Sequence, residues 1–212
     1  MTEWLVRRPD LSRFVTDYRW RWAGPVFALG VTRVARGSAS FGAMTVANDL
    51  LIDGFGRVRE TVHEVVAGID EDGLAYRPDG EANPIGWLVW HLTRIQDDHV
   101  AHVAESAQLW TVGGWVERFR LPYDVDATGY GQSSVDVGLL KATADMLTGY
   151  HDAVHRATVD YLGTLSDEDY PRVVDERWDP PVTLAVRLVS VLDDATQHAG
   201  QAAYVRGLLD RR

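Results

Sequence analysis

Apolar side chains recur at helical spacing from Met44 onward, and this periodicity constrains the fold of the 212-residue chain more than any other feature. Residues three and four positions apart share one face of a helix, so such a pattern produces an apolar stripe that must be buried. The first segment predicts a helix over about residues 46–69. Its stripe is formed by Leu50, Phe55, Val58, Val62, Val65 and Val66.

Three further segments carry the same periodicity. The second helix is predicted to begin after Asn83, because an Asn-Pro pair is typical of a helix start. The third is predicted over about residues 135–165, and the fourth over about residues 183–209, after the breaker Asp179-Pro180-Pro181. Four long amphipathic helices, with no strand pattern of comparable strength, predict an all-α four-helix bundle.

The first 43 residues differ from the rest of the chain in composition and pattern. They are rich in Arg, with Glu3, Asp10 and Asp17 as their acidic residues, and they lack helical or alternating periodicity. We therefore expect two parts: a basic N-terminal extension over residues 1–43, and a helical domain over residues 44–212. The extension is interpreted as disordered or as the product of a start codon assigned too early, with a targeting role as the alternative.

Charge and composition exclude several classes of function. The net charge is −10 although the extension is basic, so the helical domain is acidic and a poor surface for nucleic acid. No apolar run approaches the roughly 20 residues that a membrane span needs, and the start of the chain does not resemble a secretory signal. We expect a cytoplasmic protein without a nucleic-acid or membrane partner. Because the chain has no Cys, any metal site must use His and carboxylate ligands.

One histidine interrupts the apolar stripe of the fourth predicted helix. His198 occupies a core position, where a polar side chain needs a partner. Asp194 lies four residues earlier on the same face, so its carboxylate and the imidazole can share one ion. On the second helix His91 flanks the stripe that contains Leu88 and Ile95. Two imidazoles and one carboxylate from two helices predict a divalent-metal site with positions left for water or substrate.

A structural interpretation competes with the metal site, because a lone His on an apolar face is more often a hydrogen-bonded core residue than a ligand. Two other histidine pairs also have helical spacing, His151 with His155 and His99 with His102. Neither pair has a carboxylate placed as clearly on a core stripe. We interpret both pairs as residues of helix surfaces or pocket linings.

Two segments resemble the signature regions of the DinB-like superfamily: NPIGWLVWHLTRIQDDH, residues 83–99, and DDATQHAGQAAYVRGLL, residues 193–209. The resemblance is strongest to the actinobacterial branch of mycothiol-dependent S-transferases related to maleylpyruvate isomerase, and it extends from about Met44 to the end. It implies a four-helix bundle, often dimeric, whose metal ligands by position are His91, Asp194 and His198. Many members have His where this chain has Asp194, whereas the isomerase branch has a carboxylate there.

The resemblance also implies a reaction. A bound divalent ion lowers the pKa of a thiol, and the resulting thiolate is a strong nucleophile. Since the chain lacks Cys, the thiol would be a cosubstrate, and the resemblance implies mycothiol. We therefore expect a metal-dependent thiol S-transferase, a homodimer with Zn as its ion and Ni, Fe or Mn as alternatives, that conjugates mycothiol to a small electrophile. Arg94, Gln201 and Arg206 are predicted to bind the cosubstrate, with plain solvation as the alternative for each.

Two other functions use the same ligands. Metal-bound water or thiol could hydrolyse or isomerise a carbonyl substrate, and a non-catalytic metal-binding stress protein needs only the ion. A site open to solvent favours the enzymes, whereas a closed site favours the structural role.

Overall fold

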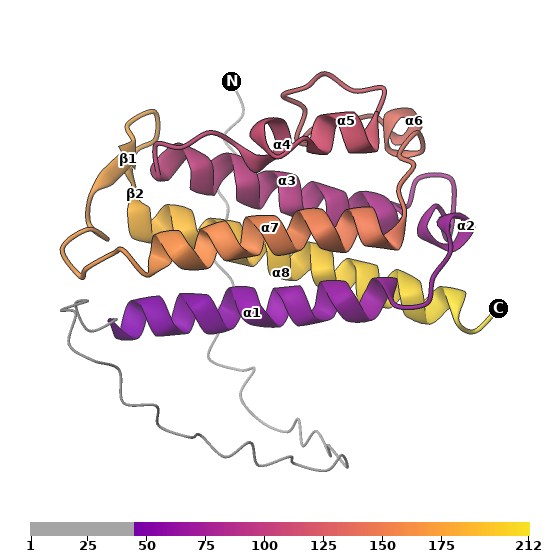
Figure 1. The fold of residues 1–212 in the computed structure, drawn as a ribbon, viewed down its shortest axis with the longest axis horizontal. Coiled ribbons are helices and arrows are strands. Elements are labelled where there is room, and N and C mark those ends of the chain that lie inside the picture. Colours follow the sequence, from indigo (N-terminus) through magenta and orange to yellow (C-terminus); the bar gives the residue numbers. More distant parts are fainter. Residues whose placement is uncertain (1–44) are drawn as a thin grey trace, which may run out of the picture. The chain divides into compact units, whose positions relative to one another are not determined.

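The computed structural model of the protein describes residues 45–212, and four long helices packed side by side dominate this part of the chain (Figure 1). They are α1 (Val46–Val66), α3 (Ile85–Val103), α7 (Ala144–Leu162) and α8 (Leu184–Leu209). The predicted all-α four-helix bundle is confirmed. The predicted N-terminal extension, residues 1–43, lies outside the described residues.

Shorter elements occupy the connections between the long helices. Within residues 45–212 they are α2 (Glu71–Leu74), α4 (Leu109–Val112), α5 (Trp115–Phe119), α6 (Ser134–Val137) and the antiparallel strands β1 (Val173–Asp175) and β2 (Val182–Thr183). None of the described helices combines the length and apolar character needed to cross a lipid bilayer.

Three of the four long helices begin at a threonine that caps them. The hydroxyls of Thr45, Thr143 and Thr183 each accept a hydrogen bond from the backbone N–H three residues later, which satisfies a donor left free at the helix start. Helix α3 begins differently. Pro84 itself occupies the cap position, one residue after the Asn83 cap that the sequence predicts.

The third predicted helix is interrupted, so the prediction of one continuous helix over residues 135–165 was wrong. The structure has α6, which ends at Val137, and then α7, which begins after the Thr143 cap. A threonine whose side chain caps the following turn favours a new helix start over continuation of the old one. Leu140 lies in the break and is nevertheless buried, which explains why its position fits the apolar pattern.

Helix α3 is the most buried of the four long helices. It contacts α7 and α8, and the connection that carries α4 and α5 lies along it (Figure 1). Nearly all of its residues are buried, including the polar residues His91, Thr93, Arg94, Gln96 and Asp97. Buried polar groups require partners, so the side chains of α3 determine which groups the neighbouring elements must supply.

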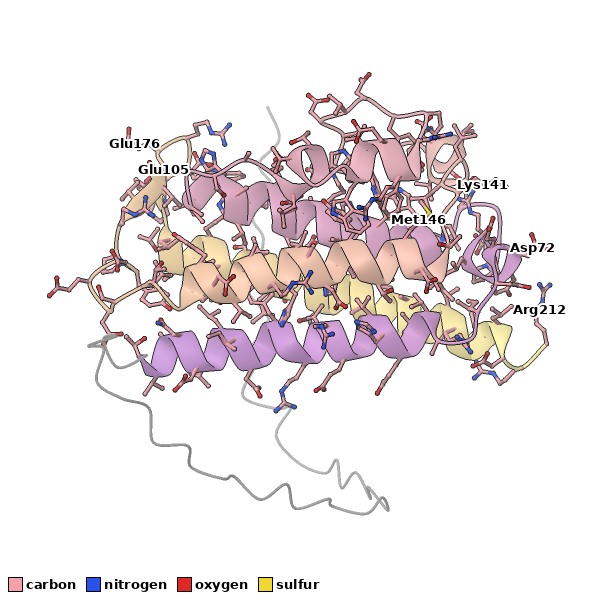
Figure 2. All side chains as sticks on the ribbon, viewed as in Figure 1. Asp72, Glu105, Lys141, Met146, Glu176 and Arg212 are labelled. Atoms are coloured by element: carbon pink, nitrogen blue, oxygen red, sulfur yellow. The ribbon has the colours of Figure 1, made fainter. Side chains whose placement is uncertain are left out.

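The bundle has two distinct ends. Figure 2 shows Glu105, just after α3, and Glu176, in the turn between the strands, at one end of the bundle. Asp72 and Arg212 lie at the opposite end, where α8 finishes. Helices α3 and α8 run in opposite directions between these ends, which brings the first half of α3 beside the second half of α8 (Figure 1).

Candidate metal centre

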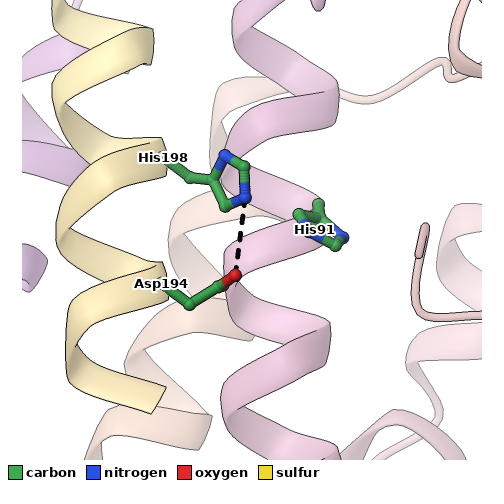
Figure 3. Close-up of side chains that lie close together, drawn as sticks. All are labelled: His91, Asp194 and His198. Carbon is green, nitrogen blue, oxygen red and sulfur yellow. Dashed lines mark ion pairs between the residues drawn. The ribbon is translucent and has the colours of Figure 1, made fainter. Parts of the chain in front are cut away.

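Three side chains converge between α3 and α8. His91 comes from α3, and Asp194 and His198 come from successive turns of α8 (Figure 3). Each can offer one ligand atom such that all three atoms lie within 4.8 Å of one another. We call these three residues the donor cluster. Among residues 45–212, no other set of three or more His or carboxylate side chains meets this criterion.

The orientation of the His91 ring is fixed by its surroundings. The ring stacks on Trp87 with 4.6 Å between centroids, and its Nδ1 lies 2.6 Å from the carbonyl oxygen of Thr128. Because a carbonyl only accepts, Nδ1 carries the proton and Nε2 keeps a free lone pair. Burial lowers the pKa of His91, which favours the neutral imidazole that a metal requires.

A glycine allows the chain to approach His91 this closely. Gly129 has φ +95°, and a Cβ added to it would lie 2.6 Å from Nδ1 of His91 and 3.0 Å from Trp87. The indole N–H of Trp87 also donates to Gln132 in the same loop at 2.8 Å. The loop therefore orients a predicted ligand from behind. Sequence reasoning missed this role, because the contact joins residues far apart in the chain.

The two cluster residues of α8 interact with each other. Nε2 of His198 lies 3.6 Å from Oδ1 of Asp194, and its Nδ1 lies 3.0 Å from Oε1 of Gln201. The neighbouring carboxylate of Asp194 is the largest influence on the pKa of His198 and raises it, although burial opposes the shift. The second carboxylate oxygen of Asp194 is buried and has no hydrogen-bond partner among the described residues.

This arrangement fits a divalent metal ion. A buried carboxylate oxygen without a partner is costly, and an ion would satisfy it. Two imidazole nitrogens and one carboxylate oxygen form a donor set used by catalytic zinc and accepted by other first-row metals. The hydrogen bonds from Nδ1 of His91 and of His198 are the contacts that usually orient metal-binding histidines.

Comparison with known proteins identifies the family. The family model described as Mycothiol-S-transferase matches residues 50–211. The chain belongs to the mycothiol-S-transferase family. The DinB-like resemblance inferred from two short segments is therefore confirmed. No curated protein matches the chain. A solved structure, a conserved protein from Enterococcus faecalis, is similar at 30% identity and a TM-score of 0.75, over 80% of this chain and 100% of that one.

The residues predicted to bind the mycothiol cosubstrate lie in different environments. Gln201 is exposed and contacts His198, so it borders the donor cluster. Arg94 is fully buried, and it donates to the carbonyl of Ala127 and to the side chain of Gln108. These hydrogen bonds fix the segment between α3 and α7 against α3. Binding of the cosubstrate by Gln201 stays a prediction, and the position of Arg94 favours a structural role.

Arg206 also has structural partners. Its Nη1 donates to the carbonyls of Val65 and Ala67 at 3.0 Å each, and its Nε donates to Asp210. The last carbonyls of α1 have no partner within their own helix, so the guanidinium caps them. The predicted cosubstrate contact of Arg206 is untested, and the structure offers this second explanation for its presence.

Within the part of the chain that the structure describes, the other histidine pairs do not converge on a third donor. His151 is fully buried, with Nδ1 against the hydroxyl of Thr93, so interpreting it as a surface or pocket residue was wrong. His99 and His102 line a cavity of about 310 Å³, as expected for pocket-lining residues. His155 is half-buried on α7.

Proposed function

We propose that the protein is a metal-dependent thiol S-transferase that conjugates mycothiol to a small electrophile at the donor cluster. The convergence of His91, Asp194 and His198 in a member of the mycothiol-S-transferase family carries this proposal. The sulfur must come from a cosubstrate because the chain contains no Cys. Zinc is the ion we expect, since two nitrogens and one oxygen suit it and leave a position open.

The reaction follows from thiol chemistry. A divalent ion at the cluster would lower the pKa of a bound thiol, so that the thiolate is available near neutral pH. The thiol proton passes to solvent, and a sulfur electron pair forms the new carbon–sulfur bond. In a substitution the leaving group departs with its bonding electrons. In an addition to a double bond, the π electrons move to the neighbouring atom, which takes up a proton from solvent.

The protein orients the two imidazoles of the donor cluster and leaves the cluster accessible to a substrate. Thr128 and Gln201 hold the two imidazoles from behind, and stacking on Trp87 keeps the ring of His91 from rotating. The side chains of His198 and Asp194 are 19% and 33% exposed, so a substrate can reach the cluster from the α8 side. This access favours an enzyme over a closed structural site.

Metal analysis followed by a conjugation assay tests the proposal. We expect close to one divalent ion per chain, and metal-dependent conjugation of mycothiol to a chromogenic electrophile such as 1-chloro-2,4-dinitrobenzene. Glutathione and cysteine at the same concentration are the matched thiols, and His102→Ala is the matched variant because its exposed imidazole lies outside the cluster. A protein that binds no ion, or that conjugates all thiols equally with and without metal, would overturn it.

A further inference from the structure

A groove opens beside the donor cluster, between α8 and the segment that precedes α3. Its volume is about 690 Å³, within the roughly 300–1,000 Å³ range typical of small-molecule sites. Gln197, Gln201 and Tyr204 line it from α8, and Asp79 and Asn83 line it from the other side. We call it the Tyr204 groove.

The groove adjoins the donor cluster. Gln201 belongs to both, because its side chain lines the groove and its Oε1 lies 3.0 Å from Nδ1 of His198. Leu88, another lining residue, lies on α3 one turn before His91. None of the three cluster residues lines the groove itself, so a ligand in the groove would lie one side chain, that of Gln201, away from His198.

The lining chemistry favours an uncharged polyhydroxylated ligand. Three amide side chains and one carboxylate line the groove, and no Arg, Lys or His does. Nε2 of Gln197 already donates to Asp193 and Oε1 of Gln201 contacts His198, which leaves Oε1 of Gln197 and Nε2 of Gln201 to accept from and donate to hydroxyl groups. A phosphate or carboxylate would find no cation there, whereas a hydrocarbon would leave the amides unpaired. Tyr204 is 67% exposed, and its ring offers a flat apolar surface for the C–H face of a sugar.

A second cavity, nearer the strands, has the opposite character. It is about 310 Å³, and its lining includes Asp98, Asp175, Arg177 and Arg187. Asp175 pairs with both arginines at 2.9 and 3.0 Å, so the charges of this cavity are largely engaged with one another. A neutral polyol would have to compete with these ion pairs. The two cavities therefore differ in the ligands they suit.

We propose that the Tyr204 groove binds the sugar portion of the cosubstrate thiol, a neutral glycoside of an amino sugar and a cyclitol in mycothiol. The proposal rests on the proposed function, and it assigns the thiol to one side of the cluster. The ring of Tyr204 stacks on the glycoside, while Asn83, Gln197 and Gln201 bind its hydroxyls. The cysteine arm of the thiol then extends past His198 to the cluster.

Calorimetric titration with the sulfur-free glycoside N-acetylglucosaminyl-inositol, whose acylated nitrogen is neutral as it is in mycothiol, isolates this contact from catalysis. The full chain should bind it equally well before and after metal removal by a chelator. Tyr204→Ala should weaken binding by about tenfold, and Tyr204→Phe should retain most of it, because the ring supplies the contact. Trp178→Ala is the matched control, since Trp178 is 64% exposed in the turn between the strands, at the other end of the bundle.

The possible outcomes distinguish failure of the groove assignment from failure of the proposed transferase reaction. Equal affinity of Tyr204→Ala and wild type, or no binding of the glycoside by wild type at concentrations where mycothiol binds, would overturn the groove assignment and leave the transferase proposal standing. Glycoside binding that depends on Tyr204, in a protein without metal-dependent conjugation, would support the groove and overturn the transferase. Melting temperatures of the variants should match wild type because both aromatic side chains are exposed.

Discussion

Asp194 and Asp152 both lie against histidine side chains, and they differ in what else surrounds them. Asp194, in the donor cluster, faces His198 and His91 between α8 and α3. Asp152, on α7, accepts hydrogen bonds from Nε of Arg59 at 2.7 Å and from His63 at 2.8 Å. We call Arg59, His63 and Asp152 the Asp152 cluster.

The difference explains why one arrangement suits a metal and the other does not. Burial raises the pKa of Asp152, but the hydrogen bonds from Arg59 and His63 outweigh it and lower the pKa overall. The carboxylate of Asp152 is therefore already paired with a cation, the guanidinium of Arg59. Asp194 has no arginine partner, and one of its oxygens is buried without a hydrogen bond. A His–Asp contact therefore predicts a metal site only where the carboxylate still lacks a permanent cation.

Removal of one imidazole from the donor cluster should cause the largest loss of metal affinity. His198→Ala deletes a predicted ligand, so we expect metal affinity to fall by more than the roughly 100-fold that loss of an orienting partner can cost. Competition with a chromogenic chelator measures it. Thermal stability in the presence of metal should fall as well, because an ion that binds only the folded chain stabilises it.

His155→Ala is the matched control from the other side of the bundle, since His155 is a half-buried histidine on α7 that lies outside the donor cluster. Its metal affinity should equal that of wild type. Asp194→His should retain the ion, because it exchanges one ligand type for another. Tight binding in His198→Ala, together with loss of metal in His155→Ala, would move the site to α7.

The loop behind His91 should give the second-largest effect. Gly129→Ala places a Cβ 2.6 Å from Nδ1 of His91 at φ +95°, so the loop or the imidazole must shift. We expect a loss of about 1–3 kcal/mol in the free energy of unfolding and a loss of about 10–100-fold in metal affinity. Urea unfolding of the metal-free protein and chelator competition measure the two quantities.

Gly131→Ala separates strain from ligand positioning. Gly131 has φ +72°, but a Cβ there would meet no atom within 4 Å. This variant should lose stability through backbone strain while it keeps metal affinity. Equal metal affinity in both alanine variants would show that the loop does not orient His91.

The sequence predicted the bundle and the donor cluster for the same reason. Helical periodicity fixes which residues share a face, so it placed Asp194 and His198 one turn apart on one face and His91 beside the apolar stripe of the second helix. The role of Gly129 depends on a loop that returns to α3, and no periodicity encodes such a contact. The break before Thr143 was missed because Leu140 continues the apolar pattern outside any helix.

His151 shows how burial changes the meaning of a histidine on the Asp152 side of the bundle. Burial, reinforced by the charge of His155, lowers the pKa of His151 to about 3. The unfolded chain takes up the proton near pH 6.5 and the folded chain only near pH 3, so stability is lost as pH falls through this window. Between pH 6.5 and pH 5 this histidine alone costs about 2 kcal/mol.

His151→Leu should remove this acid sensitivity. Thr93 keeps its hydrogen bond to the carbonyl of Val89, so the substitution leaves no new unpaired donor there, and Nε2 of His151 has no partner to lose. Urea unfolding at pH 7 and pH 5, with chelator present in both proteins, should show a smaller difference for the variant. If the free energy of unfolding still falls by the same amount between pH 7 and pH 5, groups other than His151 cause the loss of stability in acid.

A substitution in the Asp152 cluster should have the smallest effect on the free energy of unfolding. His63→Ala leaves Asp152 paired with Arg59, and the side chain of His63 is 39% exposed, so solvent already screens the contact. We expect a loss below about 1 kcal/mol, partly offset because Ala favours the helix. Urea unfolding at low and high salt measures it, and the loss should shrink as salt rises. Metal content should not change. Loss of the bound ion in His63→Ala, with full occupancy in His198→Ala, would mean that Asp152 holds the metal despite its arginine.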